Sequence, residues 1–392
     1  MSIPETEVLN NLVARVFRIE DVTSEDPRKG IFLRYRGKLV DEDSASLYDL
    51  LADSLIPYGI IPLFKIEEDR QVIYLAPKPP KPKKDNINTN IILFVLTIFS
   101  VMLAGAQPEG AIPDNLAGQL LMLAKRILTG WPFALSLLGI LVAHELGHYF
   151  MSRYHKTPAT LPYFIPFPFS PLGTMGAAII MRAIPKNKRV LFDIGVAGPI
   201  AGLVVAIPVL FFGLSLSTLG TITPDPNGFL EGNSLLYLLA KFVTFGQLLP
   251  SPVEPQGISY WLRYFFTGQP VPFGGLDVFI HPVAFAGWAG ILVTALNLIP
   301  LGTLDGGHVI YALFGDKAKK TFPFIVGLLA VMGFFWSGWW LWAALLFWLG
   351  RVNAEPLDQI TTLDPTRRGL AFFMIVVFIL LFMPVPFMTL AQ

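Results

Sequence analysis

The sequence contains no cysteine, and its charged residues are few. Without cysteine, the chain forms neither disulfide bonds nor thiolate metal sites, so any metal must be bound by histidine or carboxylate side chains. Only 15% of the 392 residues are Asp, Glu, Lys or Arg, against about 25% in soluble globular domains. The net charge of +1 lacks the positive excess of nucleic-acid-binding domains. The first residues show no basic segment followed by an apolar one, so we expect no cleaved signal peptide.

Apolar residues, in contrast, make up 53% of the chain and form long runs. Several runs approach the ~20 residues that an α-helix needs to cross a bilayer. The sequence therefore predicts a polytopic α-helical membrane protein. Residues 321–349 are long for one span and short for two, and bases on both flanks favour a helical hairpin there. The other expected spans are residues 91–106, 131–151, 192–216, 278–299 and 370 onward.

The N-terminal residues 1–76 are predicted to form a small soluble α+β domain. Charge is concentrated in this part of the chain, with 14 acidic and 13 basic residues within 1–84. The domain contains no histidine, so we expect it to be regulatory rather than catalytic. Its expected elements are a strand at 30–37, a helix at 45–55 with Leu47, Leu50, Leu51 and Leu55 on one side, and a hairpin formed by 60–66 and 71–75.

A Pro/Lys-rich linker, residues 77–90, is expected to join this domain to the membrane domain, residues 91–392. The linker carries Lys81, Lys83 and Lys84, and six further bases lie between 153 and 189, two spans later. Basic residues favour the cytoplasmic side of a membrane. We therefore expect the N-terminal domain and the 152–190 loop to face the cytoplasm.

The second expected span carries the sequence His144-Glu145-Leu146-Gly147-His148. Residues four apart share one face of a helix, so both imidazoles can reach one metal ion. Glu145 lies beside them and can take a proton from a water molecule there. This is the H-E-x-x-H pattern of zinc hydrolases, and ionisable residues inside an apolar span indicate a functional site. A chance match is the alternative, but the chain has only five histidines.

Catalytic zinc usually has three protein ligands, and Asp305 is the best third candidate. This residue follows the 278–299 span, whose end is expected at the same membrane depth as His148. The glycines at 306 and 307 permit a tight turn. The alternative is an ordinary turn aspartate before two glycines, with no metal.

Together, the segments HELGHY and NLIPLGTLDGGH resemble the motifs of the site-2 protease family of intramembrane zinc metalloproteases. The resemblance covers about residues 131–310, the expected catalytic core. It implies that zinc is the cofactor, that Asp305 is its third ligand and that Asn297 contacts the substrate backbone. It also implies that the substrates are transmembrane segments of other proteins, cleaved in regulated intramembrane proteolysis. The second segment matches N-x-x-P-x-x-x-L-D-G at Asn297, Pro300, Leu304, Asp305 and Gly306.

Other stretches resemble the same family. Residues 164–180 look like its membrane-dipping β-hairpin beside the active site, and residues 177–180 are placed to pair with a substrate strand. Gly195, Gly198 and Gly202 let neighbouring helices approach closely, and residues 195–199 resemble the family's Gly-Pro helix. The soluble domain and the extra C-terminal spans are similar to the branch found in plastids and photosynthetic bacteria.

The three remaining histidines are not expected to bind the metal. His308, three residues after Asp305, is a candidate hydrogen-bond partner for that carboxylate. His155 is expected in an interfacial loop, and His281, near the start of a span, is expected to be structural or interfacial.

The sequence leaves three alternatives to the protease. A metal-ion transporter or metal-binding membrane protein would need polar groups through both leaflets, whereas the His and Asp residues cluster on one side. An inactive binding protein is disfavoured because Glu145 is present. A zinc protease with a glutamate as third ligand would need an acid-bearing helix after HELGHY, and none follows.

Overall fold

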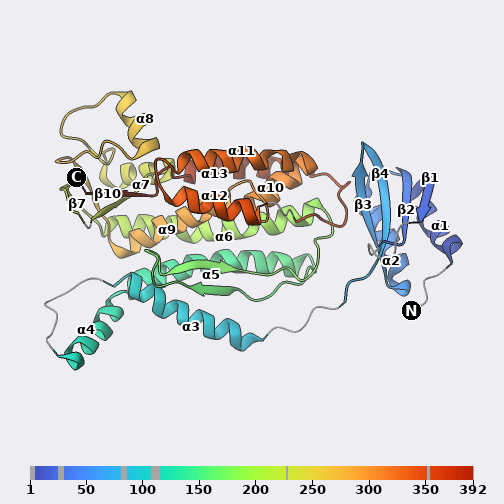
Figure 1. The fold of residues 1–392 in the computed structure, drawn as a ribbon, viewed down its shortest axis with the longest axis horizontal. Coiled ribbons are helices and arrows are strands. Elements are labelled where there is room, and N and C mark those ends of the chain that lie inside the picture. The colour runs from blue at the N-terminus through green and yellow to red at the C-terminus, as the bar shows by residue number, and fades with distance from the viewer. Residues whose placement is uncertain are drawn as a thin grey trace.

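The computed structural model describes residues 5–24, 31–80, 86–106, 115–226, 228–350 and 354–391. It has a small α+β domain at the N-terminus and a mostly helical remainder. Figure 1 shows the small domain beyond one end of the long helices. In the predicted linker, β4 ends at Pro77 and α3 begins at Ile87, while Lys81, Lys83 and Lys84 lie outside the described residues.

The N-terminal domain is an antiparallel sheet of four strands in the order β1-β2-β4-β3, packed against α1 (Thr6–Ala14) and α2 (Ser44–Leu55). The predicted helix and hairpin are confirmed, and the hairpin turns at Glu68 and Asp69, both with positive φ. The predicted position of Leu50 is wrong: it is 52% exposed, because the buried face of α2 runs through Tyr48, Leu51 and Leu55. The strands are β1 (Phe17–Ser24), β2 (Leu33–Leu39), β3 (Ile60–Glu67) and β4 (Arg70–Pro77).

Among the described residues, three helices are long and apolar enough to cross a membrane. They are α3 (Ile87–Ala104), α5 (Trp131–Tyr154) and α6 (Lys188–Ser215). Each coincides with an expected span, and α3 begins four residues earlier than expected. α5 and α6 pack against each other and against α9 (Pro282–Asn297), where Gly287 faces Leu210 of α6 and Gly290 faces Ile140 of α5.

The C-terminal part adds shorter helices to this core. α10 (Asp305–Phe314) packs on α6, and α13 (Pro365–Leu381) packs on α9 and α10. The ambiguous stretch 321–349 is two helices that pack on each other, α11 (Phe322–Met332) and α12 (Gly338–Leu349). A seven-residue 3₁₀ helix, η3 (Gly315–Thr321), precedes them.

A hairpin of β5 (Tyr163–Pro166) and β6 (Thr174–Ala178) follows α5, as expected for residues 164–180. Helix α3 holds it through polar contacts. The Asn90 amide donates hydrogen bonds to the carbonyls of Leu161 and Pro162 at 3.1 and 2.9 Å, and the Ser100 hydroxyl donates one to Gly173. Figure 1 shows the hairpin running alongside α5.

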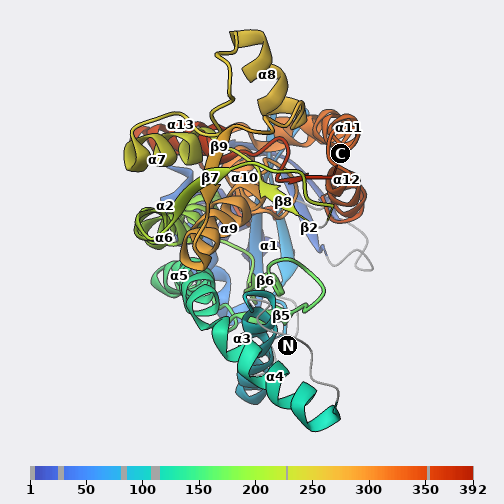
Figure 2. The ribbon, with the colours of Figure 1, turned by 90° about the vertical axis from the view of Figure 1, so that its left-hand side faces the viewer.

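Residues 217–226 and 228–280 lie at the end of the helices opposite the N-terminal domain (Figure 1). Inside this region the Lys241 ammonium, which is fully buried, lies 3.1 Å from Asp277 Oδ1. Viewed from that end, α4 (Leu116–Thr129) and α8 (Ile258–Thr267) project away from the core in opposite directions (Figure 2). The other elements here are β7 (Thr218–Thr221), β8 (Phe229–Glu231), α7 (Leu235–Phe245), β9 (Leu276–Phe279) and β10 (Phe387–Thr389).

Candidate metal centre

Helix α5 carries the first half of the site in its C-terminal part. His144 and His148 lie one helical turn apart and are 3% and 7% exposed. Glu145 is likewise buried. Burial of three ionisable side chains costs free energy unless they are paired or bind a metal ion. The local sequence therefore points to a ligand or partner facing this side of α5.

Asp305 supplies the second half, from the first residue of α10. The chain leaves α9 after Asn297 and turns at Gly302, which has φ +59°. The expected tight turn at Gly306 and Gly307 is wrong, because both glycines already belong to the first turn of α10. A carboxylate at a helix N-terminus also interacts favourably with the helix dipole.

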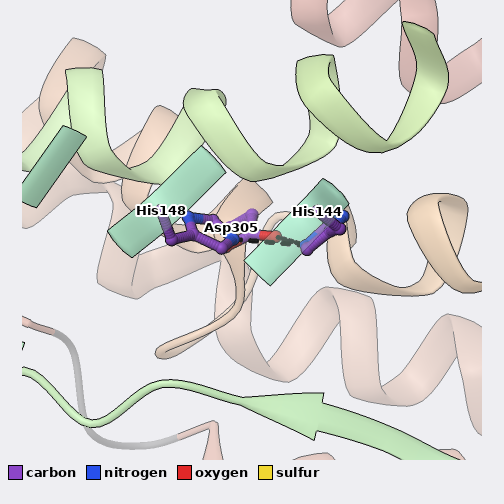
Figure 3. Close-up of side chains that lie close together, drawn as sticks. All are labelled: His144, His148 and Asp305. Carbon is purple, nitrogen blue, oxygen red and sulfur yellow. Dashed lines mark hydrogen bonds and ion pairs between the residues drawn. The ribbon is translucent and has the colours of Figure 1, made fainter. Parts of the chain in front are cut away.

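The three side chains point toward one another, as Figure 3 shows. His144 Nε2 lies 3.2 Å from His148 Nε2 and 3.2 Å from Asp305 Oδ2, and His148 Nε2 lies 3.3 Å from Asp305 Oδ1. A tetrahedral zinc ion with bonds of about 2.0–2.1 Å separates its ligands by about 3.3 Å. Two imidazole nitrogens and a carboxylate oxygen are also ordinary zinc donors. The residues present therefore fit this metal.

Helix α6 fixes the orientation of these rings. The Nδ1 atom of His148 lies 2.7 Å from the Ile194 carbonyl oxygen, which leaves Nε2 directed at His144 and Asp305. Gly198 makes room for the ring, because a Cβ atom there would lie 2.0 Å from His148 Nε2. At Gly202 a Cβ atom would lie 3.1 Å from His144 Nδ1. The expected close approach at these glycines is confirmed, and the groups that approach are the imidazoles.

Two further groups border the donor cluster. The backbone N–H of Ile179, just after β6, lies beside the Glu145 carboxylate. The Asn297 amide nitrogen lies 3.4 Å from His144 Nε2, so the last residue of α9 also faces the cluster. The predicted site residues are thus together, although they come from three helices.

The other histidines lie apart from the donor atoms. His155 caps the C-terminus of α5 and bonds Asp193 at 2.9 Å, and His281 caps the N-terminus of α9 by accepting from Val283 N–H. His308 is buried against Gly195. Among the described residues, no hydrogen bond joins its imidazole to Asp305, so the predicted partnership is absent there.

Sequence reasoning missed the backbone groups that hold the site and one ionic cluster beside it. No residue type identifies the Ile194 carbonyl or the Ile179 amide, since any residue supplies them. The Arg367 guanidinium binds Asp193 of α6 through two hydrogen bonds of 2.7 and 2.6 Å. The only sequence signal for that cluster is Asp193, a charged residue inside the expected span 192–216.

Residues 132–336 match the model of Peptidase family M50, which is just over half of the chain. "Probable zinc metalloprotease EGY1, chloroplastic" of Arabidopsis thaliana is 31% identical over 260 residues, covering 65% of this chain and 43% of that protein. "Probable zinc metalloprotease EGY2, chloroplastic" of Oryza sativa subsp. indica is 27% identical over 382 residues, covering 93% and 64%. The chain thus spans less than two thirds of either relative. No solved structure matches the chain.

Proposed function

Because the chain belongs to Peptidase family M50, we propose that it is an intramembrane zinc metalloprotease. It would hydrolyse peptide bonds in or near transmembrane segments of other membrane proteins. The observation that carries this proposal is the convergence of His144, His148 and Asp305 beside Glu145, on a helix long and apolar enough to cross a membrane. The chloroplast zinc metalloproteases among its relatives support the same activity and the plastid branch.

Each site residue then has a distinct role. His144, His148 and Asp305 would hold zinc, which when bound polarises a carbonyl and acidifies water. Glu145 would accept the proton of the attacking water and pass it to the leaving amine. The Ile179 amide lies beside this carboxylate. Asn297 would donate a hydrogen bond to the substrate backbone beside His144.

The hairpin offers a place for an unwound substrate. A helix engages its carbonyls in internal hydrogen bonds, so a transmembrane segment must extend locally before its peptide bond is accessible. Strand β6 pairs with β5 on one edge, and an extended peptide adds to a free strand edge through backbone hydrogen bonds. Because residue 179 follows β6 and lies beside Glu145, a peptide along β6 would lie next to the general base.

We propose that the N-terminal domain is regulatory and lies on the cytoplasmic side, or the equivalent side of an organelle membrane. Basic residues at the C-terminal end of α5 and just after it, such as Arg153 and Lys156, support this orientation. The donor cluster lies near that end of α5, while its first half, residues 131–143, carries no charged residue. A one-sided cluster favours a protease over a metal-ion transporter, which would need polar groups along the whole path.

A comparison of membrane proteomes tests the activity. Cells with wild-type protein are compared with cells carrying Glu145→Gln, which retains the shape of the side chain but cannot accept the proton. Full-length single-span proteins should accumulate in the variant, and their fragments should disappear. Identical proteomes, together with no cleavage of those proteins by the purified wild-type enzyme loaded with zinc, would refute the proposed function.

A further inference from the structure

The connection between α12 and α13 makes an extended contact with two distant parts of the chain. We call residues 354–364 the strap. On one side, Phe64 N–H donates to the Leu357 carbonyl and Gln359 N–H donates to the Phe64 carbonyl, both at 2.9 Å. On the other side, Leu357 and Asp358 donate to the carbonyls of Pro185 and Lys186, at 3.0 and 2.8 Å. The strap therefore continues the sheet of the N-terminal domain from β3 to the loop before α6 (Figure 1).

Asp358 is the centre of this contact. Its backbone forms one parallel β-bridge with Phe64 on one side and another with Asn187 on the other side. Its carboxylate is completely buried, and Ser44 of α2 donates its hydroxyl to both oxygens at 3.0 Å. The strap itself adds the Ile360 and Thr361 amides, at 2.8 and 3.1 Å. A buried carboxylate is tolerated only when it is bonded in this way, so its burial depends on the N-terminal domain being docked.

Apolar and ionic contacts extend the same interface. The side chains of Leu357 and Ile360 pack against the hydrophobic core of the N-terminal domain. Lys186, in the loop before α6, forms an ion pair with Asp49 of α2. The N-terminal domain is therefore fixed to the membrane part by a defined surface and not only by its covalent linker.

The opposite side of the strap holds the first turns of α6. Asn187, the partner of Asp358, caps α6 by accepting from Val190 N–H at 3.0 Å. Arg189 donates to the Thr362 carbonyl at 3.0 Å. Two turns into the helix is Ile194, whose carbonyl orients His148. A continuous set of hydrogen-bonded groups thus leads from Ser44 to a candidate zinc ligand.

We propose that Asp358 is a positioning residue that couples docking of the N-terminal domain to the zinc site. When the domain is docked, the strap holds the start of α6, and the Ile194 carbonyl keeps His148 directed at the metal. When the domain is released, the Asp358 carboxylate loses Ser44 and takes up water, and the first turns of α6 lose their support. A partner that binds or displaces the N-terminal domain would therefore change catalysis without touching the active site. The catalytic part of this inference rests on the proposed function.

The first test replaces Asp358 in the full-length chain. Asp358→Ala should raise amide hydrogen exchange in residues 185–194 and lower zinc affinity about tenfold, since groups that orient metal ligands contribute 10–100-fold. We expect a similar fall in kcat with KM unchanged, because the hairpin that meets the substrate is intact. Asp358→Asn, which keeps an acceptor oxygen, should have a smaller effect. Asp53→Ala, an exposed acid of α2, is the matched control and should match wild type.

A crosslink separates coupling from a local folding defect. The chain has no cysteine, so Asp49→Cys and Lys186→Cys can be joined selectively by a short bismaleimide across the interface. In the Asp358→Ala background the crosslink should restore zinc affinity and kcat, whereas the uncrosslinked pair should not. If Asp358→Ala shows fast amide hydrogen exchange at residues 185–194 but binds zinc as tightly as wild type, the coupling is overturned. If its amide exchange at these residues equals that of wild type, the positioning role of Asp358 is overturned.

The two proposals fail in different ways. If the wild-type protein binds zinc but cleaves nothing, the proposed function fails, while zinc titration and hydrogen exchange still decide the coupling. If wild type cleaves and Asp358→Ala binds zinc and cleaves equally well, the coupling fails and the function stands.

Discussion

The Nδ1 nitrogen of His148 donates a hydrogen bond to the carbonyl oxygen of Ile194, 2.7 Å away. This contact links α5, which carries the H-E-x-x-H sequence, to α6. It also selects the tautomer of His148, because a donating Nδ1 leaves the Nε2 lone pair free for a metal. The geometry of the metal centre is therefore set jointly by two helices, and it should be sensitive to changes in α6 that remove no ligand.

The first prediction separates the zinc ligands from the general base. Asp305→Ala removes a charged donor that lies within 3.3 Å of both imidazoles, so both bound zinc and cleavage should fall to background. Glu145→Gln should retain about stoichiometric zinc but lose ~10²–10⁴-fold in turnover, as expected for loss of a general base. Metal content by mass spectrometry and cleavage of one reporter substrate give the answer. A folded Asp305→Ala protein with full zinc would disprove the ligand assignment.

The second prediction uses two glycines on facing helices. Gly198→Ala places a Cβ atom 2.0 Å from His148 Nε2, so the ring must move and both zinc affinity and activity should be lost. Gly139→Ala on α5 is the matched control, because a Cβ atom there meets nothing within 4 Å. The control should be as stable as wild type or slightly more stable. Zinc titration of both purified variants is the measurement, and equal affinities would contradict the structure.

The third prediction concerns sidedness. Single cysteines at the exposed positions Lys78 and Lys156 should react with a membrane-impermeant maleimide from the same side of sealed vesicles. A cysteine at the exposed position Glu254, in the region at the opposite end of the helices, should react only from the other side. Labelling of Lys78→Cys and Lys156→Cys from opposite sides would overturn the proposed orientation. The cysteine-free background makes each reaction specific.

The fourth prediction is a pH effect on domain docking. Burial raises the pKa of Glu355, but its hydrogen bond and ion pair with Lys319, together with Lys65, outweigh this and leave the pKa below the ordinary 4.5. A carboxylate with a depressed pKa stabilises the folded state above its unfolded value and loses this contribution as the pH falls through the folded value. Lys65 belongs to β3 of the N-terminal domain, so the part of this contribution that crosses the interface should be lost, and docking should weaken, as the pH falls below about 4.5.

Hydrogen exchange at residues 185–194 between pH 6 and pH 3.5, corrected for the intrinsic pH dependence of exchange, measures this effect. Glu355→Gln should already be weaker at pH 6 and should show a smaller further loss on acidification. If Glu355→Gln and wild type have identical pH profiles, the ion pair between Glu355 and Lys65 does not contribute to docking.

The fifth prediction tests the buried ion pair at the opposite end. Asp277→Ala leaves the Lys241 ammonium buried without its partner, and loss of one member of a buried pair costs about 3–5 kcal/mol. Thermal unfolding in detergent should show a large decrease in stability, whereas Glu254→Ala at an exposed site should show none. Combining Asp277→Leu with Lys241→Met should recover part of the loss, since neither member of the pair then buries a charge, while buried Glu231 keeps its hydrogen bond from Tyr237. A double variant as unstable as Asp277→Ala would contradict this account.

Local patterns predicted the elements whose signal lies within one segment. Spacing of four placed His144 and His148 on one face, and apolar runs located α3, α5 and α6. The α1 helix and β1 strand were missed, since in α1 only Leu9 and Val13 are buried and β1 is mostly exposed. Leu50 was misplaced because a helix with leucines on two faces does not reveal which face meets the sheet.

The support of the site was beyond sequence reasoning for a different reason. The Ile194 carbonyl and the Ile179 amide are backbone groups, and their positions depend on how α6 and β6 dock on α5. The same holds for Asp358, which is 314 residues from its partner Ser44. Such pairings follow from the three-dimensional arrangement and leave no local pattern.

The pairing of Phe64 with the strap has a consequence for work with fragments. An unpaired edge strand is a template for association with other chains. In the intact protein, residues 357–359 cover the edge of β3 at Phe64, so this edge is protected by a segment almost 300 positions later in the chain. A fragment ending before α3 would expose that edge together with the apolar surface that Leu357 and Ile360 cover. If such a fragment forms dimers or aggregates, the cause is therefore the absence of the strap from the exposed edge. This association does not show that the whole protein forms an assembly.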